Sequence, residues 1–282
     1  MNFNISSENL NNPLLKEILI KLTDYFQSIN SDFYVIGATA RDIILNGIYN
    51  HTSSRRTVDL DIAVAIKDWG KFGQISRELC EIDGFQKSER EKQLFIYKNI
   101  FRVDIVPFGE IATADIHIYW PPQGDIAMSV VGFIDVANKT LSISIDNEFT
   151  IKIASLPGIC ILKIIAFNDR KLKTNKDADD LAFILENYLE INQDRAVKEH
   201  YEIYEAEHFD TFTAGAILMG YDIKSIFGDN EGAINTLIQI LEVELKREFE
   251  SPLINQMIET HKNLKFETIL EALKNLHQKL KE

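Results

Sequence analysis

The chain has 282 residues with a formal net charge of −13, and 45% of its residues are hydrophobic. This composition indicates a globular protein with a full core, built as one large domain or two unequal ones. The acidic balance argues against bulk electrostatic binding of nucleic acid, and neither a signal-peptide pattern nor an apolar run of membrane-spanning length is found in the sequence. Two distant cysteines, Cys80 and Cys160, favour buried thiols in a reducing cytoplasm over a disulfide or a zinc site.

The first half of the chain alternates between predicted helices and strands. Apolar spacing and end residues predict helices over residues 13–26, 38–45 and 72–82. Apolar or alternating runs predict strands over residues 33–37, 58–66, 94–97, 101–108, 132–136, 141–145 and 150–153. Residues 110–130 have no regular period and are predicted to form a long loop.

From residue 156 onwards the sequence is helical almost throughout, with breaks near residues 168–175, 228–232 and 251–252. The predicted fold class is therefore α/β (α+β), with a mixed β-sheet domain and flanking helices over residues 1–153. A helical domain follows over residues 154–282.

The charge is unevenly distributed along these domains. Residues 1–150 carry a net −6, residues 151–176 a net +5, and residues 177–282 a net −12. The simplest interpretation of the basic segment is a solvated helix end followed by a polar loop. Any contact with nucleic acid is expected to be confined to this segment.

Acidic residues interrupt two apolar strands. Asp59 and Asp61 fall in the strand over residues 58–66, where i and i+2 side chains point to the same face. Two like charges held this close need a cation, and Mg²⁺ is the natural one because it prefers oxygen ligands. Asp104 interrupts the strand over residues 101–108. If the two strands are neighbours, Asp104 completes a cluster able to hold two metal ions.

A D-x-D pattern alone is weak evidence, since most such pairs are solvated loop acids. The chain contains a second one, Asp177-Ala-Asp179, whose helical context turns the two side chains apart. Asp59 and Asp61 differ because an apolar strand would bury unpaired charge at a high cost.

A glycine turn joins the strand over residues 33–37 to the next helix. Free N–H groups at the start of that helix, with Gly37 before them, form a candidate phosphate site. A plain strand-to-helix turn is the simpler interpretation of this motif alone. Arg41 could reach phosphate from the first turn, or it could pair with Asp42 or another acid.

These motifs together resemble a known superfamily. The motifs are Gly37-Ala-Thr-Ala-Arg41-Asp42, Arg56-Thr57-Val-Asp59-Leu-Asp61 and the strand carboxylate Asp104. They are similar to those of polymerase β-type nucleotidyltransferases, and the resemblance covers roughly residues 30–190. Residues 155–181 are similar to the helical part of AbiEii-like nucleotidyltransferases, some of which are toxins of toxin–antitoxin pairs. The resemblance implies a nucleotidyltransferase fold for the first domain.

The resemblance also implies roles for residues of the first domain. Asp59, Asp61 and Asp104 would bind two Mg²⁺ ions that bridge the phosphates of a nucleoside triphosphate (NTP). Asp104 would also help to activate the attacking hydroxyl. Gly37 and the N–H groups from Ala38 onwards would hold the triphosphate, where the family usually has Gly-Gly or Gly-Ser.

Further residues are implied by the same comparison. Arg41, Thr57 and Arg170 would contribute to nucleotide binding. Lys163 would neutralise phosphate charge, and Asp177 best matches the late aspartate of the AbiEii-like pattern, with Asp180 a close competitor. Helical spacing puts Lys163 and Arg170 on one face and Asp177 and Asp180 on another, and a surface charge network is the simpler interpretation of both pairs.

We therefore expect a Mg²⁺-dependent enzyme that transfers a nucleoside monophosphate from an NTP to an acceptor hydroxyl. The acceptor would be RNA or protein, and a toxin would have an antitoxin partner; a membrane partner is not expected. One alternative is a small-molecule nucleotidyltransferase of the antibiotic-modifying type, because the acidic tail suits a cationic acceptor. Another is a non-catalytic nucleotide-binding or interaction module, against which the three acids argue.

The acceptor is expected to lie between the two domains. A loop with Trp120-Pro-Pro122 and the basic stretch over residues 170–176 would line that cleft. Trp120 is more simply explained as a partly buried anchor of the loop.

Overall fold

Two units make up the chain in the computed structural model, Met1–Ser155 and Leu156–Glu282. The sequence predicts this boundary between residues 153 and 154. The structure describes residues 2–10, 12–51, 57–122, 124 and 127–282. The first unit is a mixed α/β fold and the second is helical, as the fold-class prediction requires.

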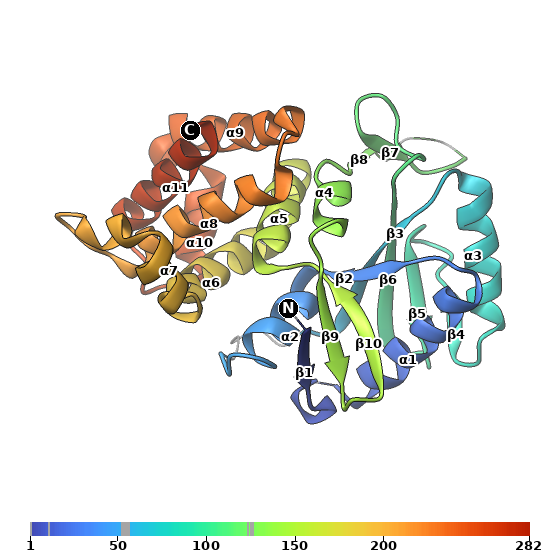
Figure 1. Cartoon of the computed structure of the whole chain (residues 1–282). Coiled ribbons are helices and arrows are strands. Elements are labelled where there is room, and N and C mark those ends of the chain that lie inside the picture. The colour runs from blue at the N-terminus through green and yellow to red at the C-terminus, as the bar shows by residue number, and fades with distance from the viewer. Residues whose placement is uncertain (1, 11, 52–56, 123, 125–126) are drawn as a thin grey trace. The chain divides into compact units, whose positions relative to one another are not determined.

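A mixed sheet of eight strands forms the centre of the first unit (Figure 1). The strands are β1 (Asn2–Ile5), β2 (Phe33–Ile36), β3 (Asp59–Ala65), β4 (Phe85–Lys87), β5 (Leu94–Tyr97), β6 (Phe101–Phe108), β9 (Leu141–Ile145) and β10 (Phe149–Ile153). Their order across the sheet is β1-β9-β10-β2-β3-β6-β5-β4. The central strand β3 is antiparallel to β2 and parallel to β6.

Helices cover both faces of this sheet. They are α1 (Pro13–Ser28), α2 (Gly37–Leu45), α3 (Trp69–Glu81) and α4 (Phe133–Ala137), with a short 3₁₀ helix at Ser7–Asn9. On one face, α1 and α3 are joined by the Tyr25 hydroxyl, which donates to Glu78 at 2.8 Å. On the opposite face, the Tyr34 hydroxyl of β2 donates to the Phe133 carbonyl of α4 at 2.9 Å.

The second unit consists of α5 (Leu156–Arg170), α6 (Lys176–Ile191), α7 (Gln193–Glu199), α8 (Thr211–Phe227), α9 (Glu231–Lys246), α10 (Pro252–Thr260) and α11 (Phe266–Lys281) (Figure 1). Two 3₁₀ helices, Tyr201–Glu205 and Glu248–Glu250, lie between them. Three of the breaks between these helices fall at the predicted positions, whereas those at residues 192, 200–210 and 261–265 were not predicted. No helix in the described ranges is long and apolar enough to cross a membrane.

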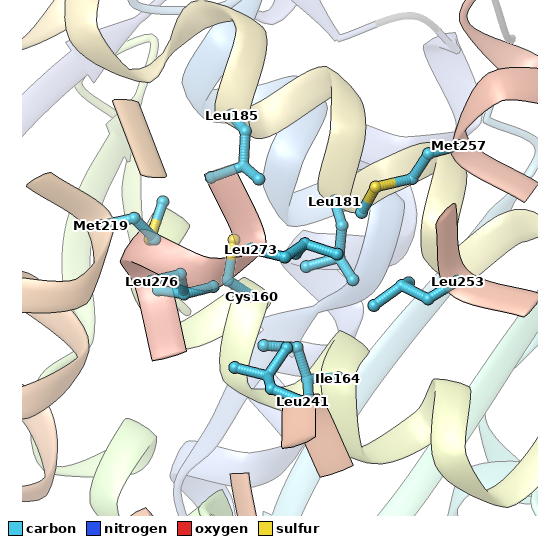
Figure 2. Close-up of a pocket in the computed structure, with 10 residues that line it drawn as sticks. All are labelled: Cys160, Ile164, Leu181, Leu185, Met219, Leu241, Leu253, Met257, Leu273 and Leu276. Carbon is cyan, nitrogen blue, oxygen red and sulfur yellow. The ribbon is translucent and has the colours of Figure 1, made fainter. Parts of the chain in front are cut away.

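The core of the helical unit is tightly packed. Figure 2 shows apolar side chains that converge from six helices around a gap of about 10 Å³. The gap is lined by Cys160, Ile164, Leu181, Leu185, Met219, Leu241, Leu253, Met257, Leu273 and Leu276. A space of this size without polar partners does not hold even one water molecule stably, so it is packing space and not a ligand site.

Three predictions for the first unit are wrong in detail. Residues 110–130 were predicted to be a loop but contain a two-stranded sheet, β7 (His117–Tyr119) with β8 (Ala127–Ser129). The strand predicted over residues 132–136 is α4, which starts after Gly132 with a left-handed φ of 81°. Short strands β1 and β4 were not predicted. Their three or four residues are too few for periodicity to identify.

The exposure of Cys80 and of Trp120 bears on two further predictions for this unit. Cys80 is exposed, which corrects the prediction of a buried thiol, whereas Cys160 is buried as predicted. Trp120 is only 5% exposed because its ring packs against Trp69 and Phe72, with centroids 4.9 and 5.3 Å away. This packing is the anchor role considered for Trp120.

Candidate active site

The candidate site begins on β3, where acidic and apolar residues alternate. Leu60 and Ile62 are fully buried on one face of the strand. Asp59 and Asp61 alternate with them along the strand, point to the other face and are partly exposed. The alternation follows from the pleat of a strand, because neighbouring side chains point to opposite faces. β3 therefore carries two carboxylates on one side of a buried hydrophobic strand.

The neighbouring strand β6 adds a third carboxylate. In the parallel pairing of β3 with β6, Asp61 lies opposite Asp104 and Asp59 lies opposite Arg102. Residues paired across two strands share a face, so all four side chains project from the same side of the sheet. The predicted adjacency of the two acidic strands is thus realised in the backbone register.

A glycine turn lies against these acids. β2 ends at Ile36, and α2 begins at Gly37 with a left-handed φ of +68°. A Cβ at this position would lie 2.4 Å from Asp61 Oδ2. Glycine is therefore required both by the backbone conformation and by the close carboxylate. The N–H groups of the first turn, including that of Ala38, have no carbonyl partner within the helix, as at the start of any α-helix.

Asp104 is partly buried, with 14% of its side chain exposed. Burial raises the pKa of its carboxyl, and the nearby charges of Glu91 and Asp59 raise it further. The guanidinium of Arg102 opposes this effect but lies 3.9 Å from Asp104 Oδ2. Arg102 is held by hydrogen bonds of 2.9–3.2 Å to Glu91. A cation near Asp104 would therefore be stabilised by its carboxylate.

Arg41 lies below this surface. Its side chain is 0% exposed, and its Nε and Nη2 atoms donate to Asp42 Oδ1 at 2.8 and 2.6 Å. The second oxygen of Asp42 accepts a 2.5 Å hydrogen bond from the Thr57 hydroxyl. Of the two roles considered for Arg41, pairing with Asp42 is the one present. Arg56, part of the motif before Asp59, lies outside the described residues.

The chemistry of the donor set suits a divalent cation. Three carboxylates on neighbouring strands supply the hard oxygen ligands that Mg²⁺ prefers. In the side-chain positions observed, no three His, Cys, Asp or Glu side chains of the described part of the chain converge closely enough to hold one ion. The residues fit the ion in type and register, and a complete coordination shell needs oxygens from elsewhere, such as a triphosphate.

An open cleft of about 530 Å³ lies at the other end of β3. Its lining includes Tyr34, Ala65, Phe108 and Ile134. Ala65 is four residues beyond Asp61, which corresponds to about 13 Å along a strand. The cleft is separate from the carboxylates, so the candidate site is defined by strand register and not by this cleft.

The predicted basic and acidic residues of the helical unit form one cluster. The Lys163 ammonium of α5 lies 3.1 Å from Asp177 and 2.5 Å from Asp180, both on α6. Arg170 donates two hydrogen bonds to Asp177, at 2.7 and 2.8 Å. Asp177 is 1% exposed and Asp180 is 0% exposed, so the interpretation as a surface network is wrong for these two acids.

Charge pairing outweighs burial within this cluster. Burial alone would lower the pKa of Lys163, but Asp180 and Asp177 raise it overall. Burial alone would raise the pKa of Asp177, but Arg170 and Lys163 lower it overall. Lys163 and Asp177 therefore remain ionised at neutral pH, and the cluster joins α5 to α6.

Sequence reasoning missed several polar residues that the structure uses. Thr39 donates from its hydroxyl to the Asp59 carbonyl at 2.6 Å, which no sequence pattern indicates. Arg102 could have been found, because i and i+2 on a strand share a face with Asp104. Glu244 is fully buried and accepts from Lys171 and Ser251 at 3.1 and 2.9 Å. Its helical spacing from apolar residues in α9 was the available signal.

A mixed sheet with a glycine turn against a strand carboxylate, and a third acid on the adjacent parallel strand, defines the class of polymerase β-type nucleotidyltransferases. A family model described as "Nucleotidyl transferase AbiEii toxin, Type IV TA system" matches residues 22–277. The chain belongs to this family of nucleotidyltransferases. A search of curated proteins found no match.

Three solved structures match the chain at low similarity. The antibiotic-resistance factor ANT(2'')-Ia is 10% identical, with 67% of this chain and 96% of that chain covered and a TM-score of 0.35. The CdnE cyclic dinucleotide synthase of Elizabethkingia meningoseptica, solved with GTP and Apcpp, is 10% identical. The match covers 96% of this chain and 92% of that chain, with a TM-score of 0.29. The CCA-adding enzyme of Thermotoga maritima, complexed with tRNA, is 13% identical over 98% and 84%, with a TM-score of 0.25. TM-scores this low carry no argument about substrate.

Proposed function

We propose that this nucleotidyltransferase uses Mg²⁺ to transfer a nucleoside monophosphate from an NTP to a hydroxyl on RNA or protein. The observation that carries the proposal is the register of β3 and β6, in which Asp104 lies opposite Asp61 on the face that also bears Asp59. The glycine turn at Gly37 supports it, because a phosphate-binding helix start lies beside the acids.

In this proposal the three acids of the first unit hold the metal and the glycine turn holds the triphosphate. Asp59 and Asp61 would hold the metal, with Asp104 as a third oxygen donor. Bound Mg²⁺ supplies neutralisation of the triphosphate charge and lowers the pKa of the acceptor hydroxyl. The N–H groups of Gly37 and Ala38 bind triphosphate oxygens at the start of α2. These groups contribute positioning and charge stabilisation, which is most of what phosphoryl transfer requires.

The reaction forms one bond and breaks another at the α-phosphorus. The acceptor oxygen bonds to this phosphorus as the bond to the bridging oxygen breaks and pyrophosphate leaves. The proton of the acceptor hydroxyl passes to the Asp104 carboxylate. Its neighbour Arg102, 3.9 Å away, balances the charge of this carboxylate before the transfer.

Lys163 and Arg170 would neutralise phosphate charge in this proposal, with Asp177 orienting both. Lys163 is already paired with two carboxylates at 3.1 and 2.5 Å. Contact with a phosphate therefore requires its ammonium to exchange one carboxylate for a phosphate oxygen. Lys163→Arg should lower turnover less than Lys163→Met does, since the arginine keeps the charge.

A small cationic molecule is the second candidate acceptor. Residues 177–282 carry a net charge of −12, which attracts cations and repels nucleic acid.

For an acceptor on RNA or protein, we expect toxicity in cells that an antitoxin protein relieves. Growth arrest on expression that Asp61→Ala abolishes would favour that acceptor class.

The decisive experiment follows label from each of the four α-³²P-labelled NTPs in the presence of Mg²⁺. Total RNA, a protein extract and a set of aminoglycosides serve as separate acceptors. We expect label on one acceptor class, dependence on Mg²⁺, and loss of transfer in Asp59→Asn. Transfer that persists in EDTA or in Asp59→Asn would refute the proposed metal site. Absence of label on every acceptor, together with no Mg²⁺-dependent NTP binding by calorimetry, would refute the proposed function.

A further inference from the structure

Two side chains of α2 bind the chain where β3 starts, Thr39 at Asp59 and Asp42 at Thr57, just before the strand. We propose that α2 positions Asp59 for catalysis through Thr39 and through the Arg41–Asp42 pair, so that Arg41 is a positioning residue and not a phosphate ligand. This inference rests on the proposed function and assigns a task to residues that do not touch the substrate.

Strand pairing explains why Asp59 needs such support. The antiparallel pairing of β2 with β3 ends at Ile36 opposite Asp61, because the chain then turns at Gly37 into α2. Asp59 is therefore paired with β6 on one side, opposite Arg102, but has left the β2 ladder on the other side. The Thr39 hydroxyl occupies that other side, where it donates to the Asp59 carbonyl at 2.6 Å. A helix side chain takes the place of the missing strand partner.

A second contact holds the chain just before Asp59. The Thr57 hydroxyl donates to Asp42 Oδ2 at 2.5 Å. Thr39 and Asp42 lie three residues apart on α2, so both point to the same side of the helix. Together they fix the backbone at residues 57 and 59, and Asp61 is then fixed by the continuing strand.

The Arg41 guanidinium makes the buried Asp42 carboxylate tolerable. Asp42 is 8% exposed and Arg41 is 0% exposed, and a buried carboxylate without a cation would be strongly destabilising. Two hydrogen bonds from Arg41 to Oδ1 leave Oδ2 for Thr57. Because Arg41 has no exposed surface, its contribution to transfer passes through Asp42 and Thr57.

The test compares threonine variants in the full-length protein. Thr39→Val and Thr57→Val remove one hydroxyl each with little change in volume, and Thr39→Ser keeps the hydroxyl. Thr23→Val is the matched control, since Thr23 is also buried but its hydroxyl has no hydrogen-bond partner. Hydrogen exchange of the amides of residues 57–61 measures the strand itself, and the label-transfer assay measures kcat and KM for the NTP.

We expect faster exchange at residues 57–61 in both valine variants and a fall in kcat of about 10- to 100-fold, as small misplacements of catalytic groups cause. KM for the NTP should change less than about twofold, and Thr39→Ser should recover most of the lost kcat. Arg41→Lys keeps the charge but loses the two-pronged geometry. It should lower kcat in the same way, whereas a phosphate ligand would raise KM.

The amide exchange rates of residues 57–61 should differ between Thr39→Val and the control Thr23→Val. Equal rates in the two variants would overturn the positioning role. A rise in KM without a fall in kcat in Arg41→Lys would make Arg41 a substrate contact and overturn its assignment. Absence of transfer by the wild-type protein would refute the proposed function instead, and the exchange measurement would still decide whether α2 holds Asp59.

Discussion

Two buried aspartates in the two units have opposite electrostatic surroundings. Asp177 in the helical unit is 1% exposed, yet its pKa is lowered because Arg170 and Lys163 bind it at 2.7 and 3.1 Å. The side chain of Asp104 in the α/β unit is 14% exposed, and burial raises its pKa. Arg102 lowers this pKa but, at 3.9 Å, does not offset the effect of burial. The more buried carboxylate is the more easily ionised one.

The difference separates a cluster whose charges are paired from the candidate metal-binding face of the sheet. In the helical unit, cations within hydrogen-bonding distance compensate for the cost of burial, so the pairs stabilise the packing of α5 and α6. On β3 and β6, the carboxylates share one face of the sheet, and burial raises the pKa of Asp104. Perturbed acids of this kind are typical of functional sites.

The largest expected effect is on activity, from Asp61→Asn. Loss of one carboxylate from the shared face should reduce nucleotidyl transfer by about 10³-fold. The melting temperature should change little, because asparagine keeps the volume of the side chain and one of its hydrogen-bonding oxygens. Label transfer and thermal unfolding measure the two quantities. Asp24→Asn, which changes an exposed acid of α1, is the control. If Asp61→Asn lowers both activity and melting temperature, the acid has a structural role that the comparison does not assign to it.

The second effect is on stability and uses a matched pair of variants. Asp177→Asn leaves Arg170 and Lys163 without their shared carboxylate and should lower the free energy of unfolding by about 3 kcal/mol. Asp104→Asn, the same chemical change, should leave that free energy unchanged or raise it, because burial disfavours its charge. Urea unfolding of both variants measures the difference. Equal destabilisation by the two would break the comparison.

A third prediction concerns pH and His261, at the end of α10. Burial alone would lower its pKa, but hydrogen bonds to Asp179 and Glu186 raise it to about 9, above the ordinary value of 6.5. A raised pKa stabilises the folded state fully below pH 6.5, and this contribution is lost as the pH rises through about 9. The free energy of unfolding of the wild type should exceed that of His261→Gln by about 2 kcal/mol at pH 6. This difference, followed by urea unfolding, should shrink by pH 10. A margin that does not depend on pH would show that the protonated ring is not what matters.

The smallest effect is expected for an exposed ion pair. Lys98 lies 2.8 Å from Glu17, but the two side chains are 44% and 40% exposed. Solvent screens such pairs and side-chain entropy opposes them, so Lys98→Met should not shift the melting temperature measurably. A clear shift would mean that distance decides the strength of a pair in this protein more than burial does.

The acidic face could be predicted from sequence because its signal is local. Two carboxylates at i and i+2 on one apolar strand and one carboxylate on another indicate a shared face, and only the adjacency of the strands had to be assumed. α4 could not be predicted in the same way, since a run of five mostly apolar residues after Gly132 fits a strand as well as a helix. The roles of Arg41 and Thr39 depend on partners on β3 and before it, so no periodicity within α2 reveals them.

The parallel register of β3 and β6 also has a consequence for when activity can arise. Asp61 and Asp104 meet only after the chain between them has folded into α3, β4 and β5 and returned beside β3. Contacts this distant in sequence form late, since loop closure must precede the pairing. A chain still emerging from the ribosome therefore lacks this shared acidic face until the residues of β6 have been synthesised and have paired with β3.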